Sequence, residues 1–139
     1  MHPLTKGIMA VAIKNIACEL HVQPRYFNLI LSGQKTVEGR IAREKYCALK
    51  PGDWIRFMTE ESGSDPSRKT LREFDAKVVG LGRFASFSEM LSFYGLRHCL
   101  PGIRTLEEGV SIYHGFPAYE DDAKRLGTIG IEIEPEHVL

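Results

Sequence analysis

A chain of 139 residues with 43% hydrophobic content is expected to form one domain that buries a core without metals or disulfides. Its 18 basic and 18 acidic residues cancel at neutral pH, which argues against tight, sequence-independent binding to long duplex nucleic acid. The three cysteines are odd in number and widely spaced, which argues against a disulfide framework and a zinc site and favours a reducing intracellular compartment, the cytoplasm or a eukaryotic nucleus.

Residues 1–16 are expected to form a loosely ordered leader, because their apolar run is too short for a signal-peptide core or a membrane span. No membrane association is therefore expected. The domain is expected over residues 17–139 and begins with a strand at 17–22. A helix follows, opened by Pro24 at a position where the missing N–H costs nothing and ended by Gly33 as a left-handed cap.

The chain leaves this helix through a segment that carries three charged side chains in the pattern Gly33-x-Lys35-x-x-Glu38-x-Arg40. Side chains alternate along a strand, so Glu38 and Arg40 share one face, about 6.6 Å apart. Lys35 can reach Glu38 from the turn. Two interpretations are open: an exposed ion pair contributing about 0 to 1 kcal/mol, or a polar site that holds an anion or a base edge.

The rest of the chain contains strand and helix signals in alternation. Two capping-box patterns, Ser86-x-x-Glu89 and Thr105-x-x-Glu108, each predict the start of a helix, so both glutamates have a structural explanation. The remaining expected elements are strands at 53–58, 74–84 and 128–133, a mobile hairpin or loop at 60–69, helices at 87–94 and from 105 to before Pro117, and a short helix at 118–126. Gly80 and Gly82 inside the strand at 74–84 indicate a bulge, a bend of the barrel or the close approach of a ligand, and a bulge is favoured among these.

Short motifs follow one another along the chain: Gln23-Pro24, Leu29-Ile30, the Gly33 to Arg40 segment, Lys50-Pro51-Gly52-Asp53, Leu100-Pro101-Gly102 and Gly127. Their order resembles the signature of the ASCH domain, the RNA-recognition relative of the PUA domain. The resemblance covers about residues 18–134. It implies an α+β fold, a PUA-like small β-barrel with flanking helices, in which the signature lines a cleft beside the barrel.

The resemblance implies an RNA- or nucleotide-binding domain whose partner is single-stranded RNA or a nucleotide-like small molecule. Basic residues outnumber acidic ones between residues 24 and 50, and this excess would orient an anionic ligand toward the signature. The expected ligand-binding residues are Lys35, Glu38, Arg40, Arg43, Arg25 and Lys45.

Two further classes of function stay open. The first is a hydrolase with Lys35, Glu38 and Arg40 as catalytic residues, in which Glu38 acts as general base and Arg40 stabilises the developing charge of RNA cleavage. A subgroup of the resembled family deacetylates acetylated cytidine with a Lys, a Thr and a Glu; its Lys matches Lys35, but its nucleophilic Thr falls on Glu38. The second is a scaffold that binds protein partners through the acidic C-terminal third. No cofactor and no metal site are expected.

Overall fold

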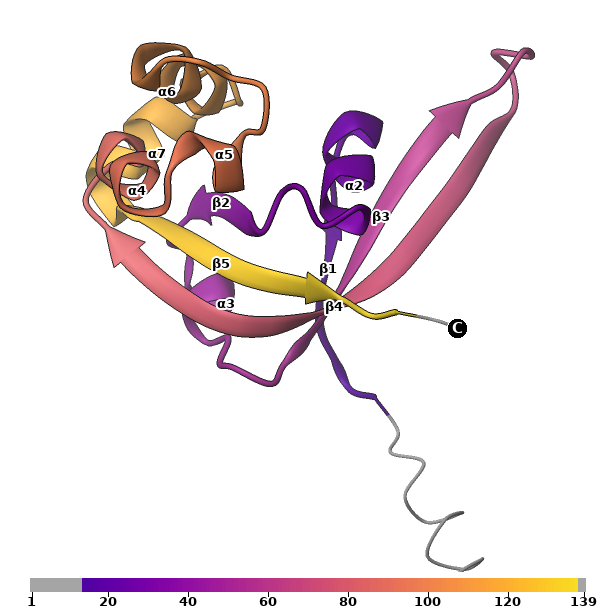
Figure 1. Ribbon diagram of the computed structural model, residues 1–139, viewed down its shortest axis with the longest axis horizontal. Coiled ribbons are helices and arrows are strands. Elements are labelled where there is room, and N and C mark those ends of the chain that lie inside the picture. Colours follow the sequence, from indigo (N-terminus) through magenta and orange to yellow (C-terminus); the bar gives the residue numbers. More distant parts are fainter. Residues whose placement is uncertain (1–13, 138–139) are drawn as a thin grey trace, which may run out of the picture.

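A computed structural model describes residues 14–137, so residues 1–13 of the expected leader lie outside the described residues. Helices α4 to α7 gather at one end of a curved sheet, and the β3–β4 hairpin projects from the other end (Figure 1). In chain order the elements are β1 (Ile16–His21), α2 (Pro24–Leu31), β2 (Val37–Ile41), α3 (Glu44–Cys47), β3 (Trp54–Ser62), β4 (Lys69–Phe84), α4 (Phe87–Tyr94), α5 (Leu96–Cys99), α6 (Leu106–His114), α7 (Tyr119–Leu126) and β5 (Thr128–Pro135).

The described strands form one five-stranded sheet in the order β1-β3-β4-β5-β2, in which β1 is parallel to β3 and the other pairs are antiparallel. The α+β class is therefore confirmed. The expected barrel is not, because β1 and β2 remain as two edges and no strand pairing joins them. The expected bulge is present: the register of β4 against β5 shifts between Val78 and Gly80.

The β3–β4 hairpin is longer than the sequence predicts. The strand expected to end at residue 58 continues to Ser62, where it pairs with Lys69, so the expected loop at 60–69 is largely strand at both ends. Cross-strand charge pairs accompany this extension, including Arg72 Nη1 to Glu61 Oε1 at 2.9 Å. The sequence signal failed here because neither face of this part of the hairpin carries an apolar alternation.

Both predicted capping boxes are present, at the starts of α4 and α6. Ser86 Oγ accepts a hydrogen bond from the Glu89 N–H at 3.1 Å, and Thr105 Oγ1 accepts one from the Glu108 N–H at 3.2 Å. Gly33 has the left-handed φ of +82° that the end of α2 predicts.

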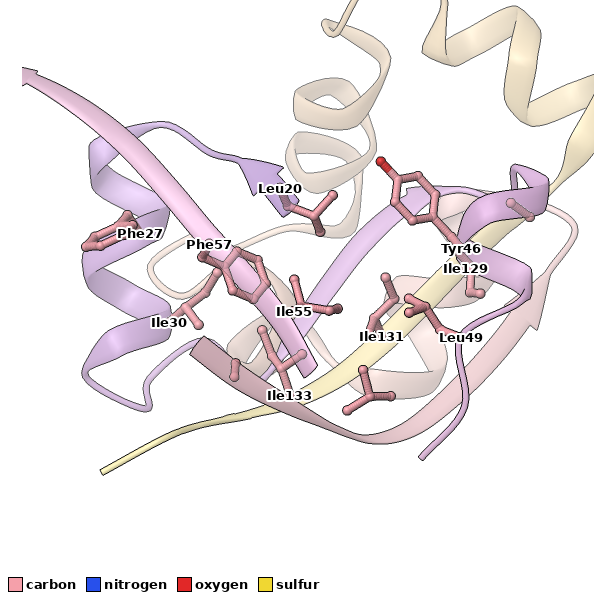
Figure 2. Packing of buried hydrophobic residues seen from close by; sticks show 13 residues of the cluster. Leu20, Phe27, Ile30, Tyr46, Leu49, Ile55, Phe57, Ile129, Ile131 and Ile133 are labelled. Carbon is pink, nitrogen blue, oxygen red and sulfur yellow. The ribbon is translucent and has the colours of Figure 1, made fainter. Parts of the chain in front are cut away.

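Two hydrophobic cores lie on opposite faces of the sheet near β2. Val37 and Ile41 belong to the second core, which they share with helix residues such as Phe87, Met90 and Leu91. Side-chain alternation therefore turns Glu38 and Arg40 to the opposite face of β2. The first core packs α2 and α3 against the sheet (Figure 2); its labelled members are Leu20, Phe27, Ile30, Tyr46, Leu49, Ile55, Phe57, Ile129, Ile131 and Ile133.

Three glycines stand in register across β4, β5 and β2: Gly82 pairs with Gly130, and Gly130 pairs with Gly39. A Cβ at Gly130 would lie 2.2 Å from Tyr94 Cε2, and one at Gly39 would lie 2.7 Å from Tyr113 Oη. Neither position has room for a side chain. The glycines thus let two tyrosines approach the sheet, and they bring the Tyr113 hydroxyl against the edge strand β2.

Candidate functional site

A pocket of about 170 Å³ lies at the open side of the sheet, between the end of β1 and the edge strand β2. An apolar cavity of about 150 Å³ is known to hold a benzene molecule, so the pocket has room for one planar ring of nucleobase size. Its lining residues come from β1, α2, β2 and the helical end of the molecule: His21, Val22, Gln23, Tyr26, Lys35, Glu38, Gly39, Arg40, Leu100, Tyr113, Phe116 and Tyr119.

Lys35 is buried beneath this pocket, where its ammonium contacts two main-chain carbonyls and one carboxylate. Its Nζ donates to Val37 O at 2.7 Å and to Cys99 O, and it lies 3.5 Å from Glu38 Oε1. Burial lowers the pKa of the Lys35 amine, and the neighbouring Glu38 carboxylate opposes that shift only in part. Two of the three ammonium donors thus go to main-chain carbonyls, and the ion pair with Glu38 helps to hold that carboxylate in place.

Glu38 and Arg40 share a face of β2, as predicted, and Arg40 Nε donates to Glu38 Oε2 at 2.7 Å. Burial alone would raise the pKa of the Glu38 carboxyl, but Arg40 and Lys35 outweigh it and hold that pKa below its ordinary value. Arg40 also reaches across the open side of the sheet, where its Nη2 donates to His21 O of β1 at 3.3 Å. A side chain thus bridges the two edges where a barrel would have ladder hydrogen bonds.

Lys35, Glu38 and Arg40, called the charged trio below, are not the exposed ion pair of the first interpretation. Their side chains are 2%, 8% and 18% exposed. The sequence could not show this burial, because the atoms that cover the trio come from helices far along the chain; the Cys99 carbonyl that Lys35 contacts is 64 positions away.

The other three expected ligand-binding residues do not line the pocket. Arg43 Nη2 donates to the carboxylate of Asp122, a residue of the acidic C-terminal third. Lys45 lies over the ring of Tyr46, with its Nζ 4.9 Å from the ring centroid. Arg25 is exposed on α2. Part of the basic excess is therefore neutralised within the fold, and the positive charge at the pocket comes from the charged trio.

Sequence reasoning missed the aromatic wall of the pocket, formed by Tyr26, Tyr113, Phe116 and Tyr119. The Tyr113 ring stacks on Phe87 with centroids 4.3 Å apart and an interplanar angle of 2°. Tyr113 falls on the apolar stripe of α6, which is the pattern of an ordinary core residue. Only the packing of α6 against Gly39 shows that its hydroxyl reaches the pocket.

The described residues give no sign of a membrane span or a metal centre. None of the helices between residues 14 and 137 combines the length and the apolar character needed to cross a bilayer. Within the same range, no three His, Cys, Asp or Glu side chains come together in a group that could hold a metal ion.

Comparison with known proteins identifies the family. The model of the ASCH domain family matches residues 20–137. The crystal structure of hypothetical protein PH0355 is 39% identical over 86% of this chain and 98% of its own, with a TM-score of 0.71. The solution NMR structure of protein PF0455 from Pyrococcus furiosus is 33% identical over 86% of this chain and 97% of its own, with a TM-score of 0.65. No curated protein is significantly similar in sequence. The chain belongs to the ASCH domain family, as its motifs predict.

Proposed function

We propose that this protein binds single-stranded RNA, or a nucleotide-like ligand, in the pocket beside the charged trio. ASCH domains are generally linked to RNA binding. The main support for this chain comes from the pocket itself. The charged trio, with a net charge of +1, lies against a space of nucleobase size that is lined by aromatic rings.

Burying three charges in a small domain calls for a functional explanation. Desolvation of buried ions often cancels the attraction between them, and apolar residues of similar volume often stabilise a fold at least as well. Arg40 has five N–H donors, and its contacts with Glu38 and His21 occupy two of them. The remaining donors can contact a phosphate or a base edge of the ligand.

The size of the pocket favours an unpaired base over a duplex. An A-form helix keeps its base edges in a deep groove, whereas the bases of a single strand can be splayed out and stacked on aromatic side chains. Few cations surround the pocket, so we expect few released counterions and a salt slope of about −1 to −2, since each phosphate contact to a single strand contributes about −0.7.

Hydrolysis in the same pocket is less well supported. A general base works best with a pKa near the operating pH, but Arg40 and Lys35 hold the pKa of Glu38 below its ordinary value. The Lys35 ammonium donates to two main-chain carbonyls and is paired with Glu38. A carboxylate at position 38 also cannot replace the nucleophilic threonine of the deacetylating subgroup. Cleavage of RNA by the purified protein that Glu38→Gln abolishes would reverse this preference for binding.

The proposal is tested by fluorescence anisotropy with one RNA sequence in single-stranded and duplex form across a salt series. We expect tighter binding of the single strand and a shallow slope. Arg40→Lys keeps the charge but loses the planar fork of donors, so it should weaken binding about tenfold. The matched control is Arg56→Lys, which alters the same residue type outside the pocket and should leave the affinity unchanged. A duplex preference with a steep slope would contradict the proposal.

A further inference from the structure

The hydroxyl of Tyr113 is buried against the pocket and has no hydrogen-bond partner within residues 14–137. Tyr113 is only 4% exposed. Burial raises the pKa of Tyr113 well above its ordinary value, so the group remains a neutral hydroxyl that can both donate and accept. Most buried polar groups in folded proteins are paired, and an unpaired one at a pocket indicates a missing partner.

Beside this hydroxyl, the N–H and C=O groups of Gly39 point away from the neighbouring strand β5. Thr36 O accepts a hydrogen bond from Ile133 N of β5, whereas Val37 O accepts one from Lys35 Nζ outside the sheet. Main-chain groups alternate in direction along an antiparallel edge strand, so Gly39 has the direction of Val37. Its N–H and C=O therefore face the open edge of β2, where Gly39 lines the pocket. They offer one donor and one acceptor side by side.

Glu38 adds an acceptor to these groups. Each of its carboxylate oxygens can accept two hydrogen bonds, and the trio supplies one cation to each: Arg40 to Oε2 and Lys35 to Oε1. The remaining acceptor capacity suits a ligand edge that carries N–H groups. Adenine, cytosine and guanine have an exocyclic amino group, whereas both exocyclic groups of uracil are carbonyl oxygens that a carboxylate repels.

We propose that the pocket takes a neutral nucleobase edge-on, with the Tyr113 hydroxyl, the Gly39 main chain and the Glu38 carboxylate as its hydrogen-bonding partners, and that it prefers bases with an amino group to uracil. This inference rests on the proposed function and assigns the chemistry of its ligand. In this arrangement Tyr113 and Gly39 recognise the base, and Lys35 acts as a positioning residue for Glu38.

The test compares Tyr113→Phe with Tyr94→Phe. Tyr94 contacts the same row of glycines, but its hydroxyl donates to Gly130 O at 3.4 Å and does not line the pocket. Calorimetric titrations use adenosine, cytidine, guanosine, uridine, ribose 5-phosphate and a short single-stranded RNA of mixed sequence. We expect Tyr113→Phe to weaken binding of the amino-bearing nucleosides about tenfold, equivalent to about 1.4 kcal/mol. Tyr94→Phe should bind as the wild type does.

Stability supplies a second readout that separates the two variants. Removing an unpaired buried hydroxyl loses no hydrogen bond, so Tyr113→Phe should melt at the wild-type temperature or above it. Tyr94→Phe loses a paired hydroxyl and should melt no higher than the wild type. A Tyr113→Phe protein that melts lower and binds normally would overturn the inference, because the hydroxyl would then have a structural partner.

The ligand panel distinguishes the remaining outcomes. Uridine binding as tightly as the other nucleosides, or ribose 5-phosphate binding more tightly than all of them, would overturn the base-edge inference and leave the pocket with a nucleotide-like ligand. Binding of the RNA alone, weakened by Tyr113→Phe, would support the inference and identify the strand as the source of the base. RNA that binds the wild type and Tyr113→Phe equally would overturn the inference only. No detectable binding of any ligand would overturn the proposed function as well.

Discussion

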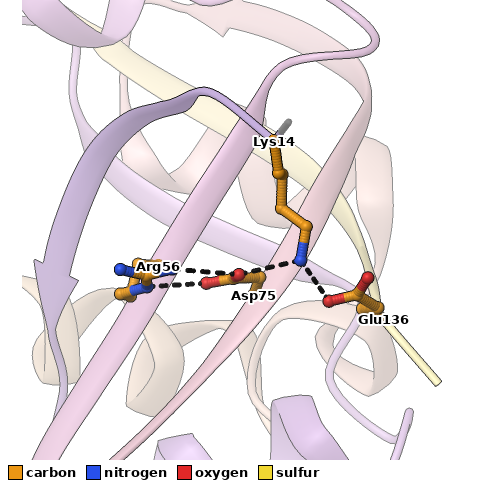
Figure 3. A network of polar contacts seen from close by, with 4 residues as sticks. All are labelled: Lys14, Arg56, Asp75 and Glu136. Carbon is orange, nitrogen blue, oxygen red and sulfur yellow. Dashed lines mark hydrogen bonds and ion pairs between the residues drawn. The ribbon is translucent and has the colours of Figure 1, made fainter. Parts of the chain in front are cut away.

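Two charged networks in this protein share one plan, a carboxylate held between two cations, and differ in burial. In the charged trio, Glu38 lies between Lys35 and Arg40. In the other network Asp75 is contacted by Lys14 and Arg56, and the three side chains are 11%, 24% and 35% exposed. This surface network, drawn in Figure 3, consists of Lys14, Arg56, Asp75 and Glu136.

The position of each network in the fold, more than its contacts, determines its role. Arg56 and Asp75 are direct cross-strand partners on β3 and β4, and Lys14 connects Asp75 to Glu136, which follows β5. The surface network therefore stabilises the pairing of these strands. The charged trio also connects distant segments, through Arg40 to His21 of β1 and through Lys35 to Cys99, but it does not link neighbouring strands of the sheet. It lies beneath a pocket, where burial strengthens every electrostatic contact and makes the loss of one partner costly.

Removing the central carboxylate should give the largest difference between the networks. Glu38→Ala leaves two cations in a buried site, so we expect the free energy of unfolding to fall by about 3 to 5 kcal/mol. Asp75→Ala leaves two cations that water reaches, and we expect a loss of about 1 kcal/mol or less. Urea unfolding of both variants measures this. Equal losses would show that the trio is no more desolvated than the surface network.

Acid should weaken both networks, and high salt should distinguish one from the other. Both carboxyl groups have a folded pKa below the ordinary values of 4.5 for Glu38 and 3.8 for Asp75. Their stabilisation is therefore complete above those values and is lost as the pH falls through the folded pKa. Salt at about 1 M shortens the screening length to about 3 Å, so it should shrink the acid-dependent loss due to Asp75 and spare that due to Glu38.

The measurement for this prediction is the free energy of unfolding from pH 6 to pH 2 at low and high salt. Glu38→Gln should remove the part of the acid loss that salt does not change, and Asp75→Asn the part that salt reduces. A loss in the wild type that salt abolishes entirely would contradict the buried position of Glu38.

A smaller effect should distinguish the two lysines at alkaline pH. Burial lowers the folded pKa of Lys35 below its ordinary value of 10.5. Between the folded pKa and 10.5 the unfolded chain binds more protons than the folded protein, so stability should rise with pH in that range. Hydrogen bonds to Glu136 and Asp75 raise the pKa of Lys14, so its stabilisation is present below 10.5 and is lost as the pH rises through the folded value. Lys35→Met should remove the upward slope and Lys14→Met should not. Identical slopes in both variants would contradict the assignment.

The sequence predicted those parts of the molecule that depend on neighbouring residues. The caps at Ser86 and Thr105, the end of α2 at Gly33 and the shared face of Glu38 and Arg40 all follow from spacings of a few residues. These local rules were enough to place the charged trio on one short segment and to match the family signature.

The parts that could not be predicted depend on distant segments of the chain. Burial of the trio requires the Cys99 carbonyl and the helices around it, and the pocket requires α6 to bring Tyr113 over Gly39. The open sheet depends on whether β1 and β2 pair, which no local pattern reports. Arg43 illustrates the same limit, because its partner Asp122 is 79 positions away and removes it from the expected basic surface.

The position of the binding site is tested most directly by an NMR titration of the isotope-labelled protein with a short single-stranded RNA, following the amide signals of both networks. We expect the signals of Val22, Gly39 and Tyr113 around the pocket to move, and those of Arg56 and Asp75 to stay in place. Signals that move around the surface network while the pocket remains unchanged, or no movement at all, would contradict the claim that the charged trio and its pocket form the binding site.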